Sequence, residues 1–420
     1  MYGFEVCGTD KPYKSWGWAG VSCNQLGTVT GLNLTALCVT VKPNATLPIL
    51  DVLATISNLT QLQSLVLSGI GLSGPLDSST SAAAPGLDTF QELQLLDISH
   101  NPGINGTLPS SWYSLAAFQT LNISHTGVTG SLPASYAALQ QLREFRAANC
   151  TRISGSLPAT WGLLELEVLE VTNAALTEAL PPEWVDAAAL RQTVEVAQLP
   201  SNSMMRQMGL WPVLKEPLAS EEVQLLVGAG MARTADSPTA AKAQLNADAS
   251  SVEPLALGML RLRVLDLSVA MPAGGGLSGT LPASYAALEQ LQVLILSGHT
   301  FNDSLPASWT RLEQLRVFDI SHNSITGSLP AWYSSMRQLT VFKANDNQLK
   351  RSASGPPEFF EFLFGPTSKL QCLSVAGNKE ELLDAAAAAK IAAKAQQRWP
   401  PVPLALNEPV SSLCDAEPWK

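Results

Sequence analysis

A motif of 24 residues recurs along this chain, and it limits the possible folds more than any other feature of the sequence. The apolar positions of residues 115–133, LAAFQTLNISHTGVTGSLP, coincide with those of residues 312–330, LEQLRVFDISHNSITGSLP. The steps 121→145, 145→169, 294→318 and 318→342 between central apolar residues are each 24 residues by subtraction. Repetition at this period is typical of chains that stack one structural unit on the next.

Each copy contains a short run that alternates between apolar and polar residues, as in Leu121-Asn122-Ile123. Period two indicates a strand with one buried face. A single strand of this length cannot bury that face, so neighbouring copies must pair at roughly 4.8 Å into a parallel sheet over a continuous leucine core. The position five residues after the central one carries a set of asparagines, which are expected to bond the backbone of adjacent turns: Asn101, Asn323, Asn347 and Asn378. Thr126, Cys150 and His299 occupy the same position in other copies.

The form LxxLxLxxNxLxGxLP resembles the plant-specific class of leucine-rich repeats. That resemblance implies a leucine-rich-repeat solenoid of the α/β horseshoe class, mostly parallel β with few convex helices. An aromatic residue follows the proline of most copies by three positions, and we expect the rings to stack as convex-side core: Trp112, Tyr136, Trp161, Trp184, Tyr285, Trp309 and Tyr333. LPxxW is similar to the repeats of kinetoplastid promastigote surface antigens and proteophosphoglycans. This second resemblance implies a surface glycoprotein, often lipid-anchored, that contacts host receptors or complement.

The period divides the chain into five parts. We expect an N-terminal cap at residues 1–30, a first block of repeats at 31–196, and a second block at 257–380. Residues 381–420 form a C-terminal cap with an alanine-rich helix and a proline-rich tail. Residues 197–256 break the pattern. Leu169 and Leu265 are 96 residues apart, four times 24, so decayed repeats are possible, but we favour an insertion folded over one side of the solenoid.

The six cysteines fall at both ends and in the first block of repeats. Residues 16–23 are similar to the WxGVxC segment of plant-type caps, and this resemblance implies a disulfide between Cys7 and Cys23. Cys372 and Cys414 flank the last expected strand and the tail, where a disulfide could close the C-terminal end. Cys38 and Cys150 lie about four repeats apart, roughly 19 Å at 4.8 Å per strand, too far to pair, so each is expected to be a buried thiol. Capping disulfides would imply an oxidising compartment.

Seven N-x-S/T motifs favour an extracellular protein, although those at Asn33 and Asn122 fall on expected strands and can belong to the repeat itself. The remaining five are candidate glycosylation sites: Asn44, Asn58, Asn105, Asn149 and Asn302. The start of the chain lacks a signal peptide, and no apolar run is long enough for a membrane helix, so any membrane anchor is expected outside this chain. A net charge of -10 without a cluster of Lys or Arg argues against nucleic acid as a partner.

The sequence offers no convincing catalytic site. Asp97, Ser99 and His100 stand close together, but alternation along a strand turns His100 away from the other two. The four histidines do not supply three converging metal ligands, and no glycine-rich phosphate loop follows a strand. We therefore expect no enzyme activity, no metal and no cofactor.

The remaining candidate is the outward face of the repeat strands, where short polar residues alternate with the core. Such a surface suits hydrogen bonding to a protein or glycan ligand. We predict an extracellular or cell-surface recognition protein, and the alternative is a signalling-receptor ectodomain with its ligand site at residues 197–256. The candidate face consists of Asp97, Ser99, Asn122, Ser124, Arg146, Glu170, Thr172, Asp266, Ser268, Asp319, Ser321 and Lys343.

Overall fold

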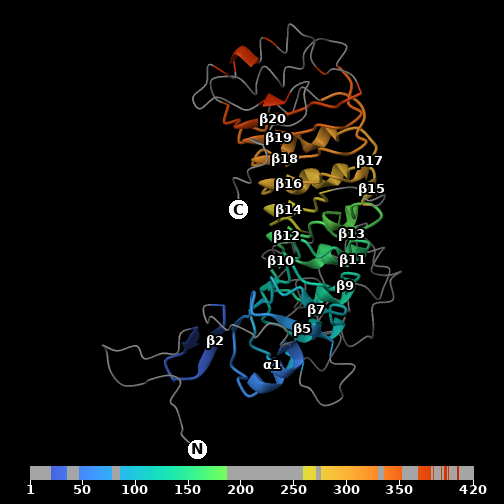
Figure 1. Cartoon of the computed structure of the whole chain (residues 1–420). Coiled ribbons are helices and arrows are strands. Elements are labelled where there is room, and N and C mark those ends of the chain that lie inside the picture. Colours follow the sequence, from blue (N-terminus) through green and yellow to red (C-terminus); the bar gives the residue numbers. More distant parts are fainter. Residues whose placement is uncertain are drawn as a thin grey trace, which may run out of the picture.

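The computed structural model describes residues 20–35, 47–77, 86–186, 259–270, 276–329, 335–351, 368–379, 382, 389, 392–394, 396 and 404–405. One strand per turn builds a sheet of 13 strands that runs the length of the molecule (Figure 1). The first pair is antiparallel and every later pair is parallel. In order across the sheet these are β1 (Val21–Cys23), β2 (Val29–Asn33), β4 (Ser64–Val66), β6 (Leu95–Asp97), β8 (Thr120–Asn122), β10 (Glu144–Arg146), β12 (Val168–Glu170), β14 (Val264–Asp266), β16 (Val293–Ile295), β18 (Val317–Asp319), β19 (Val341–Lys343), β20 (Cys372–Ser374) and β21 (Leu404–Ala405).

The return path of most described turns contains a second short strand and a single turn of 3-10 helix. The second strands pair in three small parallel sheets: β3 (Leu47–Pro48), β5 (Leu72–Pro75) and β7 (Gly103–Asn105); β9 (Thr129–Gly130), β11 (Arg152–Gly155) and β13 (Ala175–Leu176); β15 (Ser278–Gly279) and β17 (Thr300–Phe301). The 3-10 helices are η2 (Leu87–Thr89), η3 (Ser110–Ser114), η4 (Ala134–Ala138), η5 (Ala159–Leu163), η6 (Pro182–Trp184), η7 (Ala283–Ala287) and η8 (Ala307–Arg311). One longer helix, α1 (Ile49–Ile56), lies near the N-terminal end. The predicted solenoid with few convex helices is confirmed.

The aromatic residues after each LP pair form the stacked column that the sequence predicts. Tyr136 and Trp161 are fully buried, and their rings lie 6.5 Å apart and 7° from parallel. From Tyr136 to Trp309 each polar ring atom also donates to a proline carbonyl one turn back. The Trp161 indole donates to the Pro133 carbonyl at 3.0 Å, and the Tyr285 hydroxyl to that of Pro181 at 3.1 Å. The column therefore joins successive turns by packing and by hydrogen bonds. Tyr333 lies outside the described residues.

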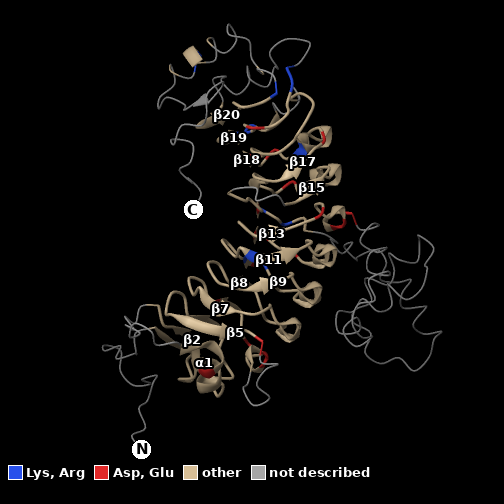
Figure 2. Ribbon diagram, turned by 45° about the vertical axis from the view of Figure 1, so that its right-hand side comes forward, with Lys and Arg blue, Asp and Glu red and all other residues tan. Residues whose placement is uncertain are grey.

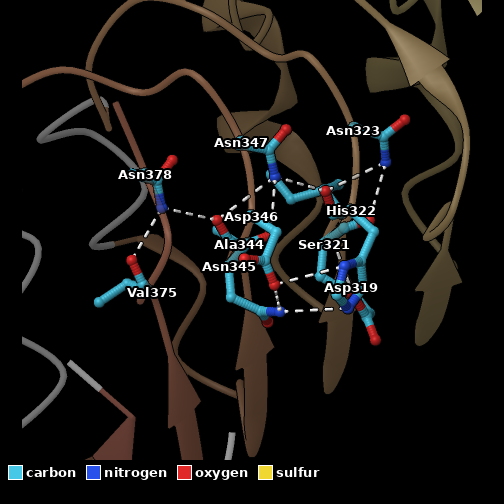
Figure 3. Close-up of polar contacts among 11 residues, drawn as sticks. Asp319, Ser321, His322, Asn323, Ala344, Asn345, Asp346, Asn347, Val375 and Asn378 are labelled. Atoms are coloured by element: carbon cyan, nitrogen blue, oxygen red, sulfur yellow. Dashed lines mark hydrogen bonds and ion pairs between the residues drawn. The ribbon is translucent and has the colours of Figure 1, made fainter. Parts of the chain in front are cut away.

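The predicted asparagine ladder is also present (Figure 3). Asn347 accepts a bond from the Ile325 amide of the turn before and donates to the carbonyls of Ile320 and Ala344. Asn101, Asn323 and Asn378 repeat this arrangement in their own turns. Each buried amide thus satisfies backbone groups that the corner of the coil would otherwise leave unpaired.

A second column, which the sequence analysis did not single out, occupies the residue just before the ladder. These residues have φ between 53° and 80°, in the left-handed region where Asn, Asp, His and Gly are tolerated best: Gly69, His100, His125, Asn149, Asn173, Gly298, His322, Asp346 and Gly377. The sequence contains a signal for this column, because the residue before the ladder position is Gly, His, Asn or Asp in each of these turns.

Three cysteines fall within the described residues. Cys23 and Cys372 are each disulfide-bonded. Cys7, Cys38 and Cys414 lie outside the described ranges, so the predicted pairings remain predictions. Cys150 is a buried free thiol, as expected, and its Sγ donates to the Ile123 carbonyl at 3.1 Å in the place of a ladder asparagine.

The solenoid continues across the long break without an intervening strand in the sheet. β12 pairs directly with β14, and Leu169 lies opposite Leu265. The amide of Met259 donates to the Trp184 carbonyl at 2.8 Å, and Leu262 donates to Met259 at 2.9 Å. An uninterrupted turn has the same pair of bonds, from Leu139 to Tyr136 and from Leu142 to Leu139. Met259 therefore completes the turn that η6 begins, and most of the break, including residues 197–256, lies outside the described residues.

Joining Asp186 directly to Met259 should leave the fold intact. Deletion of residues 187–258 removes 72 residues, which reduces the spacing from Leu169 to Leu265 from 96 to 24. The two bonds at Met259 then close an ordinary turn, so we expect the deletion variant to keep the circular dichroism spectrum of a solenoid. We also expect thermal unfolding within a few degrees of the full chain. As a control, removing 73 residues shifts the register by one and reverses the buried face of the following strand. Equal destabilisation by both deletions would contradict this assignment.

Candidate binding surface on the concave face

Among the twelve predicted surface residues, those at the last position of each strand lie in one line. The line runs along the face of the 13-stranded sheet that is turned away from the core. We call it the concave face. Register pairs join Asp97 to Asn122, Asn122 to Arg146, Arg146 to Glu170, and Glu170 to Asp266. Ile295 of β16 follows and interrupts the polar line before Asp319 and Lys343.

Most of these side chains are less accessible than the sequence analysis expected, and the expectation of an open polar surface is wrong for seven of the twelve. They are at most 9% exposed: Ser99, Ser124, Glu170, Thr172, Asp266, Asp319 and Ser321. The serines lie where the strand turns into the coil, and two of their hydroxyls bond neighbouring turns: Ser99 pairs with Ser68 at 2.9 Å, and Ser124 accepts from the Ala148 amide at 3.0 Å. Asp97, Asn122, Arg146, Ser268 and Lys343 remain partly exposed.

Several carboxylates and amides on this face bond their own strand. Asp97 and Asn122 each accept the backbone amide two residues on, at 2.9 and 3.1 Å. Asp319 does the same and also accepts from the Ser321 hydroxyl. Burial raises the pKa of the Asp319 carboxyl, while the bonds from Ser321 and the charge of Lys343 act in the opposite direction. These groups shape the strand ends, which leaves them less free to bind a ligand.

An ion-pair cluster covers the middle of the face. Arg146 bridges Glu144 at 3.2 Å and Glu170 at 3.0 Å, so its guanidinium joins β10 to β12. Two further ion pairs share Glu165, which contacts Arg143 at 3.1 Å and Arg261 at 3.2 Å. Because these side chains are partly solvated, each pair contributes no more than about 1 kcal/mol to stability.

The N-terminal part of the concave face contains a hollow of about 470 Å³ that the sequence analysis missed. It extends from β1 to β8 and is lined mainly by amides, hydroxyls and backbone. Gln63, Gln94 and Gln119 come from three adjacent turns, and no hydrogen bond from their side chains is present among the described residues. The signal was a glutamine two residues before the central residue of three consecutive copies.

The Asp, Ser and His residues of the two similar copies do not form a catalytic relay. His100 stacks on His125 with ring centroids 4.3 Å apart, while Ser99 bonds Ser68. In the later copy Ser321 donates to Asp319, and His322 Nδ1 lies 3.3 Å from Asp346 Oδ2 of the next turn (Figure 3).

The described part of the chain lacks a metal site, a membrane-spanning helix and a basic face. No three His, Cys, Asp or Glu side chains converge as metal ligands there. The described helices include none with the length and apolar character needed to cross a membrane. Figure 2 shows that Lys and Arg are thinly scattered over the described ribbon and form no continuous basic face.

Comparison with known proteins supports the repeat class. A family model described as Leucine Rich Repeat matches residues 314–336. The fold is similar to a TDR receptor (22% identity, TM-score 0.52), covering 77% of this chain and 44% of that one. It is also similar to the leucine-rich-repeat ectodomain of the Arabidopsis receptor kinase HAESA, solved with a peptide hormone (21% identity, TM-score 0.57), covering 87% and 45%. No curated protein matches the sequence.

The chain spans less than half of the length of these two receptor structures. At this identity they bear on the fold alone. The 24-residue motif, the parallel sheet with its asparagine ladder and the matched repeat together identify the chain as a leucine-rich-repeat protein with a solenoid fold.

Proposed function

We propose that this protein is a non-enzymatic recognition protein that binds a protein or glycan ligand through the N-terminal half of its concave face. The observation that carries the proposal is the hollow over β1 to β8, with Gln63, Gln94 and Gln119 on adjacent turns. An amide side chain both donates and accepts hydrogen bonds, so an aligned set of three suits a neutral polar ligand such as a peptide backbone or sugar hydroxyls. Asn122 and Arg146 extend this surface toward β10.

We further propose that the protein works outside the cell. Cys23 and Cys372 are disulfide-bonded, which fits an oxidising compartment. Four of the candidate sequons carry exposed asparagines, as glycosylation requires: Asn58, Asn105, Asn149 and Asn302. Asn44 lies outside the described residues. The similarity of LPxxW to promastigote surface antigens favours a cell-surface protein whose ligand is a host receptor or complement component.

The ligand site can be tested on arrays of secreted ectodomains and of glycans probed with the purified chain. Gln94→Arg combined with Gln119→Arg introduces two long cations into the hollow, so we expect at least tenfold weaker binding to any partner that occupies it, corresponding to roughly 1.4 kcal/mol. Ser110→Arg combined with Ser111→Arg on η3 is a matched control, because it adds the same two charges to exposed positions of the return path. Equal binding by the hollow variant and the wild-type chain would contradict the proposal.

A second candidate function is that of a receptor ectodomain whose ligand site is the segment between η6 and β14. The observation that favours it is the turn closed by Met259 and Trp184, which lets a 72-residue segment leave and rejoin the solenoid at one point. The variant lacking residues 187–258 separates the two functions. Binding lost in that variant but retained in the hollow variant would favour the receptor hypothesis.

A further inference from the structure

The hollow over β1 to β8 is lined by uncharged residues. All thirteen residues of its lining are Gly, Ser, Thr, Asn, Gln, Leu or Val. The turns around it are almost as neutral, because residues 52–76 and 98–142 contain no Asp, Glu, Lys or Arg. Figure 2 shows the described ribbon from β2 to β9 without any Lys or Arg. A charged ligand would lose its hydration here and find no side chain of opposite charge in the lining, so a neutral ligand fits best.

Building on the proposed function, we infer that the hollow binds a neutral, linear oligosaccharide whose sugar rings lie across strands β2, β4, β6 and β8. The oligosaccharide is thus the ligand of the recognition site already proposed, and its identity depends on that proposal. Three features of the described residues favour a sugar chain over a peptide. They are the occupied backbone, the spacing of the polar side chains and the apolar residues beside them.

The main-chain groups at the glutamines are occupied by the sheet. The Gln63 amide donates to the Thr30 carbonyl at 2.7 Å. The backbone amides of Gln94 and Gln119 donate in the same way to the glutamine one turn back, both at 2.8 Å. A peptide that binds by adding a strand needs free backbone groups at a sheet edge. At the glutamines the side-chain amides are therefore the groups left to bond a ligand, and each both donates and accepts.

The glutamines recur at the spacing of the strands. Ser64, Leu95 and Thr120 lie opposite one another in register, so the glutamines that precede them are about 4.8 Å apart from turn to turn. An extended peptide across the strands advances about 3.3 Å per residue, and its polar groups fall out of step with this row. A linear chain of pyranose rings advances by about one strand spacing per ring. Each ring can therefore present its hydroxyls to one glutamine.

Apolar side chains lie beside the row of amides. Leu95 lies between Ser64 and Thr120 in register, and Val66 ends β4. Leu95 and Val66 both line the hollow and are half-exposed. A sugar ring has a comparable division, with C–H groups on its face and hydroxyls around its rim. Packing of the ring face on Leu95 buries apolar surface, while the rim hydroxyls bond the amides.

The ends of the row limit the length of the ligand. Thr30, which lines the hollow, takes the glutamine position before the centre of β2. Arg143 takes it on the turn after Gln119, where it pairs with Glu165 at 3.1 Å and begins the charged part of the face. The four turns from Thr30 to Gln119 cover three strand spacings, roughly 14 Å, so about four rings fill the row.

Isothermal titration calorimetry on the full chain tests the ligand class with matched sugars. The neutral probes are the β-1,4-linked hexasaccharides of glucose, mannose and N-acetylglucosamine. Those of glucuronic acid and glucosamine have the same linkage as two of these probes and differ in charge. We expect at least one neutral probe to bind, and the charged probes to bind roughly tenfold more weakly or not at all. The affinity should not change with salt concentration, and it should level off beyond about four rings.

Two pairs of substitutions locate the sugar. Gln94→Ala combined with Gln119→Ala removes two amides from the row and should weaken binding of the neutral probe roughly tenfold or more. Gln292→Ala combined with Gln371→Ala is the matched control, because these glutamines take the same position of the repeat before β16 and β20, outside the hollow. The control should bind like the wild-type chain. Circular dichroism checks that both variants are folded.

Three results would overturn the oligosaccharide. If no neutral probe binds, but a protein partner from the arrays is weakened by the pair Gln94→Ala and Gln119→Ala, the proposed function stands and the ligand class is wrong. Equal binding of charged and neutral probes, or binding that weakens with salt, shows that the site does not select a neutral ligand. Equal loss in the hollow variant and its control places the sugar outside the hollow. If the arrays give no partner that depends on the hollow at all, the proposed function fails together with this ligand.

Discussion

Replacing Trp161 with alanine is expected to lower the free energy of unfolding by about 3–5 kcal/mol, the range for truncating a large buried aromatic side chain. The ring is fully buried, stacks on Tyr136 and meets the edge of Phe145 with centroids 5.0 Å apart. Its indole N–H also satisfies the Pro133 carbonyl. The variant therefore opens a cavity between two turns and removes one of the two donors to the Pro133 carbonyl, of which the Tyr136 amide is the other. Urea denaturation followed by circular dichroism measures the change.

Two conservative variants separate packing from hydrogen bonding at this position. Trp161→Tyr keeps a ring and a polar tip, and Tyr136 and Tyr285 already bond the preceding proline carbonyl in the same column. We expect it to cost less than about 1.5 kcal/mol, as for near-isosteric core changes. Trp161→Phe loses the donor and should fall between the other two, because the ring still packs while one hydrogen bond, with a net contribution of about 0.5–1.5 kcal/mol, is lost. If Trp161→Tyr were as damaging as Trp161→Ala, the column would not be interchangeable between turns.

That interchangeability explains why so much of the fold could be predicted from the sequence. A solenoid places the same position of every copy in the same environment, so each repeated residue type reports on one site many times. Leu121, Trp161 and Asn347 are buried in the strand, the aromatic column and the ladder that their positions predict. Cys150 is also buried at the position that the repeat predicts, where its thiol donates a hydrogen bond in place of the ladder asparagine.

The accessibility of the candidate surface could not be predicted in the same way. Alternation along a strand determines which face a side chain lies on, but does not tell what other part of the chain lies over that face. Glu170 and Asp266 point outward as expected and are nevertheless only 9% exposed. Two signals were nonetheless readable, namely Ile295 in an otherwise polar column and the glutamines at 63, 94 and 119. The long break was ambiguous because its 72 residues equal three periods, and only the register of β12 with β14 decides against intervening strands.

Acidification should destabilise the solenoid through His299, the one histidine that occupies a ladder position. Its Nδ1 accepts the Leu277 amide at 3.2 Å and its Nε2 donates to the Leu267 carbonyl at 2.8 Å, so the ring does the work of an asparagine only while it is neutral. Burial lowers the pKa of His299 to about 4 from 6.5, although the bond to Leu267 favours the charged form. A proton on Nδ1 would remove the acceptor and leave a buried charge.

The direction of the pH effect follows from this shift. The unfolded chain takes up a proton near pH 6.5, and the folded chain only near pH 4, so between these values the unfolded state binds more protons. The stabilisation from neutral His299 is complete above pH 6.5, decreases as the pH falls, and is lost below pH 4. A shift of this size corresponds to about 3 kcal/mol at 1.36 kcal/mol per pKa unit.

His299→Asn isolates this contribution from the other titrating groups. Asparagine at the same position makes both kinds of bond in the turn of Asn323, to the Phe301 amide and the Leu296 carbonyl, and it does not titrate. We expect urea denaturation to show less loss of stability between pH 7 and pH 4 for this variant than for the wild-type chain, by about 3 kcal/mol. His299→Ala should be destabilised at both pH values, because Leu277 and Leu267 lose their partner. If His299→Asn lost as much stability between pH 7 and pH 4 as the wild-type chain, the prediction would be wrong. The folded protein would then not lower the pKa of His299.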